Sequence, residues 1–124
     1  MQLITIMADY GLGPYAWLNE NPEESNAPGG NVADMIGGCH SDWNVSKELE
    51  AGFADWIGMF ERDSWDNFES FPWEKFHGRG IELTRRLKRE VGSAFRVRYV
   101  KPSEDPNHRV NCVVEIEADS EENL

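Results

Sequence analysis

The chain has 124 residues, a formal net charge of −11 and a hydrophobic content of 40%, with five Trp and six Phe. This length fits one domain, and the apolar and aromatic content argues against a chain that is disordered as a whole. No apolar stretch approaches the roughly 20 residues that span a bilayer, and two cysteines are too few to suggest a disulfide framework. We therefore expect a cytoplasmic protein with one domain over residues 1–124 and a frayed tail at 119–124.

The charge is distributed unevenly along the chain. Residues 1–74 carry 2 basic and 14 acidic side chains (net −12), residues 75–101 carry 9 and 2 (net +7), and residues 102–124 carry 1 and 7 (net −6). Such a field can steer a charged partner. Because the acidic segments would repel phosphates, we expect a protein partner and neither a nucleic acid nor a membrane.

The first predicted element is a buried strand from Gln2 to Ala8, which is apolar and rich in β-branched residues. Gly11, Gly13 and Ala16 follow with the spacing of a dinucleotide-binding turn. That turn requires a helix to open inside it, and Pro14 together with the Asn and Pro residues after it disfavours a helix. We interpret the motif as a tight turn and expect no cofactor.

Residues 9–45 are rich in Gly, Pro and Asn, which indicates a long connection. Within it, residues 19–31 form the strongest turn signal and are predicted to be a mobile loop. A structureless connection of this length is unusual in a compact domain. We therefore expect short strands or a helical turn near residues 15–18 and 31–36.

Two helices are predicted next. Ser46 can cap a helix that runs to about Arg62, with one apolar stripe formed by Leu49, Phe53, Trp56, Ile57 and Phe60. Pro72 fits the first turn of the second helix, and Gly92 is a natural end. Gly78 and Gly80 are unfavourable inside a helix by about 1 kcal/mol each relative to Ala, so we expect another backbone to approach closely there.

Two strands with alternating apolar and polar residues close the chain, and the turn between them predicts an antiparallel hairpin. The register that places opposite charges together pairs Arg98 with Glu115, and Arg96 with Glu117. The predicted order is strand, loop, helix, helix, strand, strand. This order indicates a two-layer α+β fold, with both helices on one face of a small mixed or antiparallel sheet.

Cys39, His40 and Asp42 form a C-H-x-D motif whose residue types can all bind metal. A zinc site needs three or four protein ligands at suitable spacing. Since only His77, His108 and Cys112 could complete such a set, we predict no metal site. A Cys–His nucleophilic pair also lacks an orienting third group.

Several residues could instead line a pocket beneath the 9–45 loop and serve a small enzyme. These candidates are Asp9, Tyr10, Trp17, His40 and His77. Asp9 follows the first strand, where functional groups often lie, but it is also well placed to cap the turn, which is the more frequent role of such a residue. His77 lies beside the apolar stripe of the second helix and can simply contribute to packing.

The segment between the two helices is both acidic and aromatic. Aromatic side chains next to carboxylates are typical of surfaces that bind a partner; the alternative is a satellite core under the long loop. The predicted partner-binding residues are Trp43, Trp65, Asp66, Phe68, Glu69 and Trp73.

Three stretches of the sequence resemble small acidic bacterial proteins of uncharacterised function. They are ADYG followed by P-x-x-W, a helix with F-x-x-W-x-x-x-F, and F-P-W-E-K-F-H-x-x-G. Some of those bacterial proteins look like immunity proteins of polymorphic toxin systems. The resemblance implies a bacterial, cytoplasmic, non-enzymatic protein and no catalytic residue. Our hypothesis is an immunity-like or antitoxin-like inhibitor that binds a basic site on a partner protein; the alternatives are a small enzyme and a homo-oligomer such as a dimer.

Overall fold

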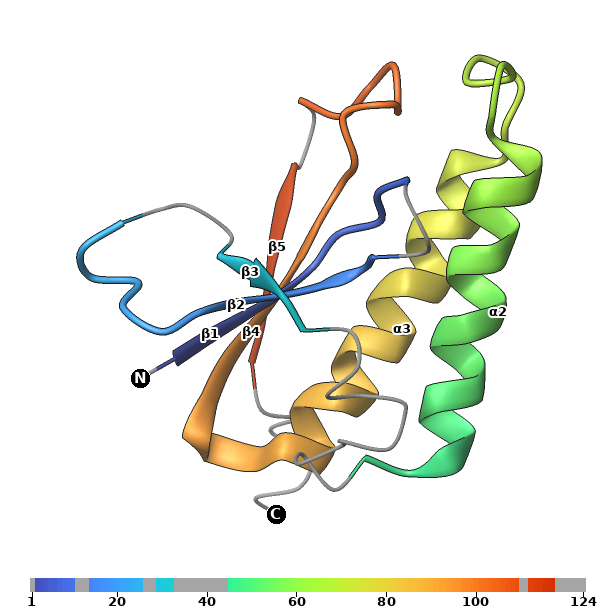
Figure 1. Ribbon diagram of the computed structural model, residues 1–124. Coiled ribbons are helices and arrows are strands. Elements are labelled where there is room, and N and C mark those ends of the chain that lie inside the picture. Colours follow the sequence, from blue (N-terminus) through green and yellow to red (C-terminus); the bar gives the residue numbers. More distant parts are fainter. Residues whose placement is uncertain (1, 11–13, 26–28, 33–44, 110–111, 118–124) are drawn as a thin grey trace.

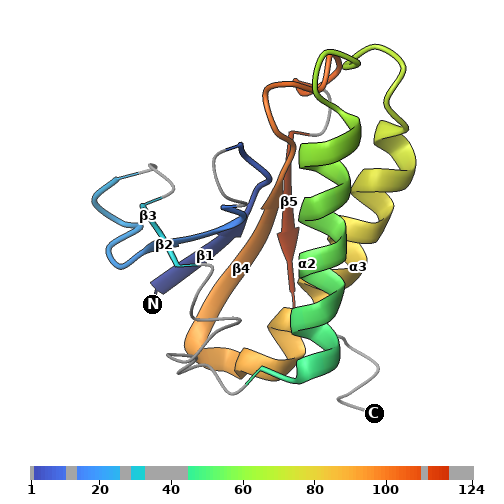
Figure 2. The same cartoon turned by 45° about the vertical axis from the view of Figure 1, so that its right-hand side comes forward.

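A computed structural model describes residues 2–10, 14–25, 29–32, 45–109 and 112–117. Two helices pack side by side on one face of a five-stranded sheet (Figures 1 and 2). This arrangement confirms the predicted α+β class. The elements are β1 Gln2–Ile6, β2 Ala16–Asn19, β3 Gly30–Asn31, α2 Lys47–Asp63, α3 Trp73–Val91, a 3₁₀ turn Gly92–Ala94, β4 Phe95–Val100 and β5 Val113–Ile116.

The sheet has the strand order β3-β2-β1-β4-β5 and is mixed. β1 lies at its centre, parallel to β4 and antiparallel to β2, and the two remaining pairs are antiparallel. A parallel pair needs a crossover connection. The α2–α3 hairpin belongs to the crossover from β1 to β4. Both helices therefore come between these two strands in the chain, although the strands are neighbours in the sheet.

The predicted long connection contains two short strands. β2 begins at Ala16, one residue later than expected, and β3 overlaps the second predicted segment only at Asn31, with residues 33–36 outside the described chain. Between β1 and β2 the chain reverses: Met7 N donates to the Tyr15 carbonyl (3.0 Å) and Asp9 N to that of Pro14 (3.1 Å). A strand therefore begins where the dinucleotide motif needs a helix.

Both helices begin and end near their predicted limits. The Ser46 hydroxyl accepts a hydrogen bond from Leu49 N (3.2 Å), which caps α2 as expected. The prediction for Pro72 was wrong by one position, since it is the N-cap residue of α3 and precedes its first turn. Gly92 ends α3 with φ 75°, a conformation that glycine adopts without strain.

The core lies between the sheet and the helices. It is dominated by aromatic rings: Trp56 stacks on Phe76 with centroids 4.6 Å apart, and Tyr15 stacks on Phe53 at 5.0 Å. The largest fully buried side chains come from β1, β4 and both helices. They include Ile4, Ile6, Leu49, Phe53, Phe60, Phe76, Leu83, Leu87, Val97 and Tyr99. The predicted stripe of the first helix is buried in full.

Gly80 allows a close approach, but of side chains and not of a backbone as predicted. A Cβ atom at this position would lie 2.6 Å from Cε1 of Tyr99 and 2.9 Å from Cζ2 of Trp56. Gly78 faces open space, with nothing within 4 Å of the point that a Cβ atom would occupy. The packing therefore explains one of the two helical glycines.

The hairpin register agrees with the charge pairing in part. Arg98 lies opposite Glu115, as predicted, and Val100 lies opposite Val113. The ladder ends at Ile116, before Glu117 can face Arg96. Arg96 instead forms a diagonal ion pair with Glu115, with Nη2 and Oε1 3.1 Å apart.

Candidate functional site

Residues 64–72 and 101–109 lie at the end of the molecule where α2 joins α3, and residues 7–10 reach the same end (Figures 1 and 2). Tyr10 joins residues 7–10 to residues 64–72. Its ring stacks on Phe60 (centroids 4.5 Å apart) and meets the ring of Trp65 edge to face (5.3 Å, 87°). Its hydroxyl forms a hydrogen bond with that of Ser64, which itself donates to the Phe60 carbonyl (2.5 Å).

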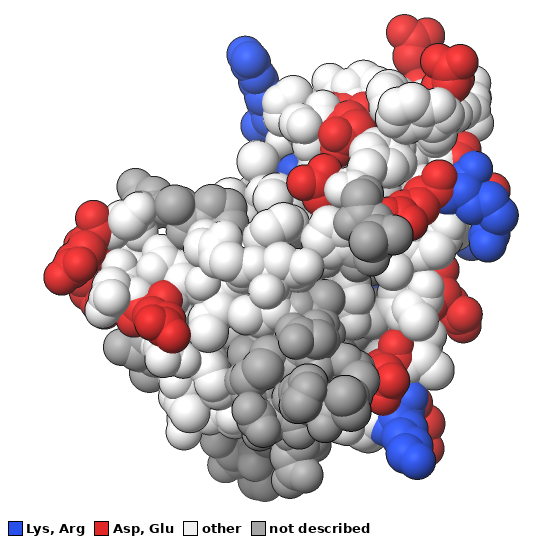
Figure 3. All heavy atoms as spheres, viewed as in Figure 1, with Lys and Arg blue, Asp and Glu red and all other residues white. Residues whose placement is uncertain are grey.

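Two glutamates influence the phenol of Tyr10 in this aromatic pair. Burial raises the pKa of Tyr10, the hydrogen bond to Ser64 opposes that change, and the negative charges of Glu104 and Glu61 raise the pKa further. Figure 3 shows acidic side chains gathered over this end, with Lys and Arg at its margins.

The turn between α2 and α3 adds the exposed ring of Trp65 and the acidic side chains of Asp66 and Glu69. Trp65 is 67% exposed, and Asp66 has a left-handed backbone (φ 59°), which Asp tolerates better than most residues. Residues 66–70 line a shallow depression. We call the surface formed by Tyr10, Glu61, Trp65, Asp66, Glu69 and Glu104 the acidic–aromatic end.

The predicted partner-binding residues divide between this surface and the core. Trp65, Asp66 and Glu69 are exposed, Phe68 is half-buried, and Trp43 lies outside the described residues. Trp73 faces inward: its indole N–H donates to the Phe68 carbonyl (2.5 Å), and its ring packs edge to face on Phe71 at 4.7 Å. The aromatic residues of the segment therefore differ in exposure, and their role in binding a partner stays a prediction.

Among the described pocket candidates, the side chains of Asp9, Trp17 and His77 each hydrogen-bond to a different partner. Asp9 accepts a hydrogen bond from Tyr10 N (2.8 Å), a local turn contact. Trp17 donates its indole N–H to the Met7 carbonyl (3.0 Å) and is half-buried on the sheet. His40 lies outside the described residues, and the side-chain hydrogen bonds of His77 go to partners other than Asp9.

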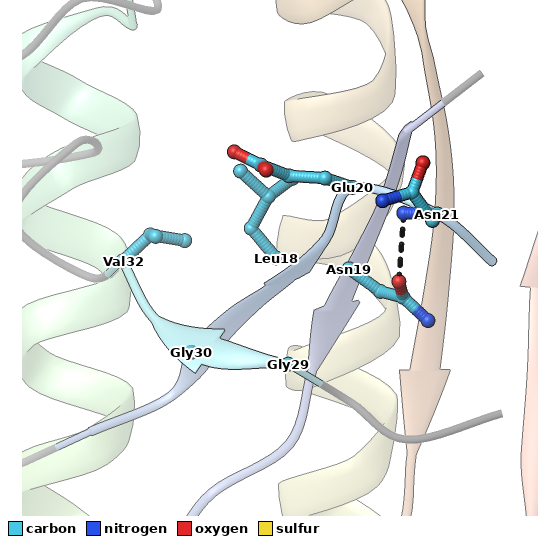
Figure 4. A pocket seen from close by; sticks show the side chains of 7 residues that line it. All are labelled: Leu18, Asn19, Glu20, Asn21, Gly29, Gly30 and Val32. Carbon is cyan, nitrogen blue, oxygen red and sulfur yellow. Dashed lines mark hydrogen bonds between the residues drawn. The ribbon is translucent and has the colours of Figure 1, made fainter. Parts of the chain in front are cut away.

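An open depression does occur within the 9–45 connection, at the outer edge of the sheet, but none of the predicted pocket residues that the structure describes is among its lining residues (Figure 4). Its one charged lining side chain is that of Glu20, and Asn21 N donates to Oδ1 of Asn19 (2.9 Å) at its border. Its lining residues are Leu18, Asn19, Glu20, Asn21, Gly29, Gly30 and Val32. The mobility predicted for 19–31 stays a prediction.

His77 lies in a buried chain of hydrogen bonds. Its Nδ1 is 2.7 Å from the hydroxyl of Tyr99, and its Nε2 is 2.7 Å from Oδ2 of Asp105. The side chains of His77 and Asp105 are 9% and 3% exposed, and the Tyr99 residue is 0% exposed. The ring of Trp73 stacks on the imidazole with centroids 5.7 Å apart.

The network fits a neutral imidazole. Burial lowers the pKa of His77, and the hydrogen bond and charge of Asp105 only partly oppose this, while Lys101 lowers the pKa further. Burial also raises the pKa of Tyr99, so the phenol keeps its proton. Tyr99 then donates to Nδ1 of the imidazole, and Nε2–H donates to Asp105.

This arrangement anchors a loop. Asp105 also accepts a hydrogen bond from Asn107 N (2.8 Å) through Oδ1, and its carbonyl accepts one from His108 N (3.0 Å). The Tyr99 hydroxyl is enclosed, so it cannot meet a substrate without rearrangement. The network therefore ties residues 101–109 to α3. Sequence reasoning singled out His77 but missed Tyr99 and Asp105.

Across the described residues, no group of three His, Cys, Asp or Glu side chains could hold a metal ion; Cys39, His40 and Asp42 lie outside this part of the chain. The described helices include none that is long and apolar enough to cross a membrane. The chain matches no protein-family model, no curated protein and no solved structure.

Proposed function

We propose that this protein is an acidic protein-binding module that occupies a basic site on a partner protein, as an immunity-like or antitoxin-like inhibitor would. The observation that carries the proposal is the edge-to-face pair of Tyr10 and Trp65, with Glu61 and Glu104 acting on the same phenol. Three separate connections contribute to this one surface, which gives it a defined shape.

The residue types suit a cationic partner. An exposed indole can be buried as an anchor when a partner docks, and the face of a Trp ring attracts Arg or Lys by about 0.5–1 kcal/mol at exposed sites. The carboxylates supply complementary charge, which raises the association rate and makes binding depend on salt. Some of the small acidic bacterial proteins that the sequence resembles look like immunity proteins, which agrees with this role.

The first test uses a hexa-arginine peptide as a probe of the surface. Replacing two carboxylates at the acidic–aromatic end, in Glu61→Gln/Glu104→Gln, is expected to weaken peptide binding about tenfold at low salt, which corresponds to about 1.4 kcal/mol. The matched control, Glu23→Gln/Glu24→Gln, removes the same charge from exposed positions in the turn after β2. Equal effects of both double variants would show a response to net charge alone and would contradict the proposal.

The second test identifies the partner in the native cell. A photo-crosslinking amino acid at position 65 should form a salt-sensitive adduct with a basic protein. The same amino acid at Ser93, an exposed residue beyond the C-terminal end of α3, is the control. An adduct with a second copy of this chain would instead support the homo-oligomer, and light scattering would then give its size. Identical adducts from both positions would contradict a defined binding surface.

A further inference from the structure

The strand β5 forms one edge of the sheet and exposes an apolar side chain there. Val113 is 49% exposed, and among the described residues Trp65 is the other large hydrophobic residue that is exposed. We propose that the edge of β5 pairs with β5 of a second copy of this chain, in a two-fold antiparallel arrangement centred on Val114. This inference goes beyond the function proposed above and does not depend on it.

The hydrogen bonds between β4 and β5 show which backbone groups of β5 point outward. Lys101 N donates to the Cys112 carbonyl (2.9 Å), and hydrogen-bonded pairs alternate with non-hydrogen-bonded pairs along an antiparallel ladder. Counting along β5 from Cys112, Val114 is therefore also bonded to β4, whereas Val113 and Glu115 are not. The backbone N–H and C=O groups of Val113 and Glu115 consequently face the edge.

This edge lacks several of the features that usually prevent pairing. Natural sheet edges are commonly protected by Lys or Pro, or by a very short strand. The other edge strand, β3, has only two residues. In contrast, β5 contains neither Lys nor Pro, and its one charged residue, Glu115, is drawn toward β4 by Arg96, with Nη2 and Oε1 3.1 Å apart. An added strand would therefore find a row of outward backbone groups.

The register centred on Val114 brings no like charges together. Val113 lies opposite Glu115 of the second copy in this register, and each such pair exchanges both of its backbone hydrogen bonds. Val113 is then covered by the aliphatic stem of that glutamate. On the helix side of the sheet, where Val114 already packs against the core, the two copies of Val114 meet. Placing Glu115 opposite its own copy would instead oppose two carboxylates.

The flank of α3 beside the β5 edge follows from its contacts. The helix packs on β4 and β5, while its other flank reaches the start of α2, where Glu90 binds Ser46 (2.6 Å). At 3.6 residues per turn, Glu74, Ile81 and Lys88 share the flank that is turned away from α2. Residues seven apart form one line along a helix, so these three side chains run beside the sheet edge.

This flank lies close to the same two-fold axis. Tyr99 faces Val114 in the ladder, and the ring of Tyr99 lies against Gly80 of α3. The axis through Val114 therefore passes α3 beside Ile81. Because strands are about 4.8 Å apart, a helix over the β4–β5 pair comes about 10 Å from its copy, a distance at which helices pack. The two copies of α3 then run antiparallel, with Ile81 facing Ile81.

The charges at the two ends of the flank are complementary in this arrangement. Glu74 is seven residues before the centre and Lys88 seven residues after it, so Glu74 of each copy faces Lys88 of the other. The Lys88 ammonium donates to the carbonyls of Gly92 (3.2 Å) and Phe95 (2.6 Å), which leaves the third of its N–H groups for a carboxylate. Strand and helix thus both match a second copy about one axis.

The arrangement keeps the acidic–aromatic ends apart. Since the two copies of α3 run antiparallel, the ends at which α2 joins α3 point in opposite directions. This separation limits the repulsion between two chains that each carry a net charge of −11. The dimer would present two acidic–aromatic ends, one at each of its extremities.

Amide hydrogen exchange over a concentration series tests the edge in the wild-type chain. The amides of Val113 and Glu115 should become about tenfold more protected once about nine-tenths of the chain is dimeric, because exchange then proceeds from the remaining monomer. The amide of Val114, which is bonded to β4, is the internal control and should not change. Light scattering gives the mass. A monomer at every concentration, or a dimer in which Val113 and Glu115 gain no protection, would overturn the inference.

Glu115→Pro removes an outward N–H and keeps the hydrogen bonds to β4. Two-fold symmetry removes this donor from both sides of the interface, so the association constant should fall at least about tenfold. The matched control, Glu115→Gln, removes the same charge and keeps the N–H, and should change the constant less than about threefold. Equal losses in both variants would show that the backbone of β5 does not form the interface.

Glu74→Lys tests the helical part of the interface and also serves if Glu115→Pro does not fold. It places two cations together at Lys88 of the second copy, which should weaken association about tenfold. The control Glu48→Lys makes the same charge change at an exposed position of α2 and should not weaken association, because it lowers the net negative charge. Equally tight association of both variants would contradict the two-fold arrangement.

Discussion

Glu90, in the last turn of α3, binds Ser46, the residue just before α2. Its carboxylate accepts hydrogen bonds from the backbone N–H of Ser46 (2.6 Å) and from its hydroxyl (3.1 Å). The same hydroxyl accepts from Leu49 N. A cap normally comes from the first turn of the same helix; here the acid comes from a residue 44 positions away, and its negative charge also suits a helix N-terminus.

Replacing Glu90 with Ala should therefore destabilise the whole domain. We expect the free energy of unfolding to fall by about 1–2 kcal/mol, because two donors at the start of α2 lose a charged acceptor. Urea unfolding followed by tryptophan fluorescence measures this. Glu82→Ala, which removes an exposed acid from the same helix, should cost less than about 0.5 kcal/mol. Equal losses in both variants would rule out a specific capping role.

The two glycines inside α3 should respond to alanine in opposite directions. In Gly80→Ala the new methyl group would overlap the rings of Tyr99 and Trp56, which should destabilise the fold by about 1–3 kcal/mol. In Gly78→Ala the methyl group meets nothing within 4 Å. That variant should be more stable than the wild type by about 0.4–1 kcal/mol, because alanine restricts the unfolded chain. Denaturation midpoints that move in the same direction would contradict the described packing.

Stability should decrease in mild acid because the pKa of His77 is lowered in the folded state. The unfolded chain then binds the proton more readily, so this contribution is fully present above the unfolded pKa of about 6.5 and is lost as the pH falls below that value. Urea midpoints measured at pH 7.5 and 5.5 test this. His77→Gln should show a smaller decrease than the wild type, whereas His108→Gln should show the same decrease. A wild-type midpoint that is higher at pH 5.5 would mean that the sign is wrong.

Trp65 should matter for binding and not for folding. Because it is 67% exposed, Trp65→Ala should change the free energy of unfolding by less than about 0.5 kcal/mol. Trp56→Ala, which removes a ring that is 2% exposed, should cost about 3–5 kcal/mol. Calorimetric or urea unfolding compares the two variants. A large loss of stability in Trp65→Ala would show that this indole belongs to the core.

The parts of the fold that follow from short-range patterns could be predicted from the sequence. Ser46 signals the start of α2, and alternation with charge pairing places Arg98 opposite Glu115. The network around His77 could not be predicted in this way, because its partners lie 22 and 28 residues further along the chain. Nothing in the spacing shows that a strand tyrosine and a turn aspartate meet at one imidazole.

The same limit applies to the candidate surface. The acidic and aromatic content of residues 63–71 is evident in the sequence, and it led us to predict Trp65 and Asp66 as partner-binding residues, both of which are exposed. The packing of α2 against α3 determines which rings turn inward, and the ring of Trp73 is one of them. Tyr10 was considered only for a pocket, because its contact with Trp65 depends on the reversal of the chain after β1.

The pairing of β1 with β4 has a consequence for biosynthesis. Thr5 and Arg98 are neighbours across the two strands, although 93 residues separate them in the chain. During translation, β1 leaves the ribosome before β4 and waits for this partner until about 93 further residues have been made. At 5–20 residues per second, this delay lasts from about 5 to 20 seconds, during which an apolar strand must be kept from pairing with other nascent chains.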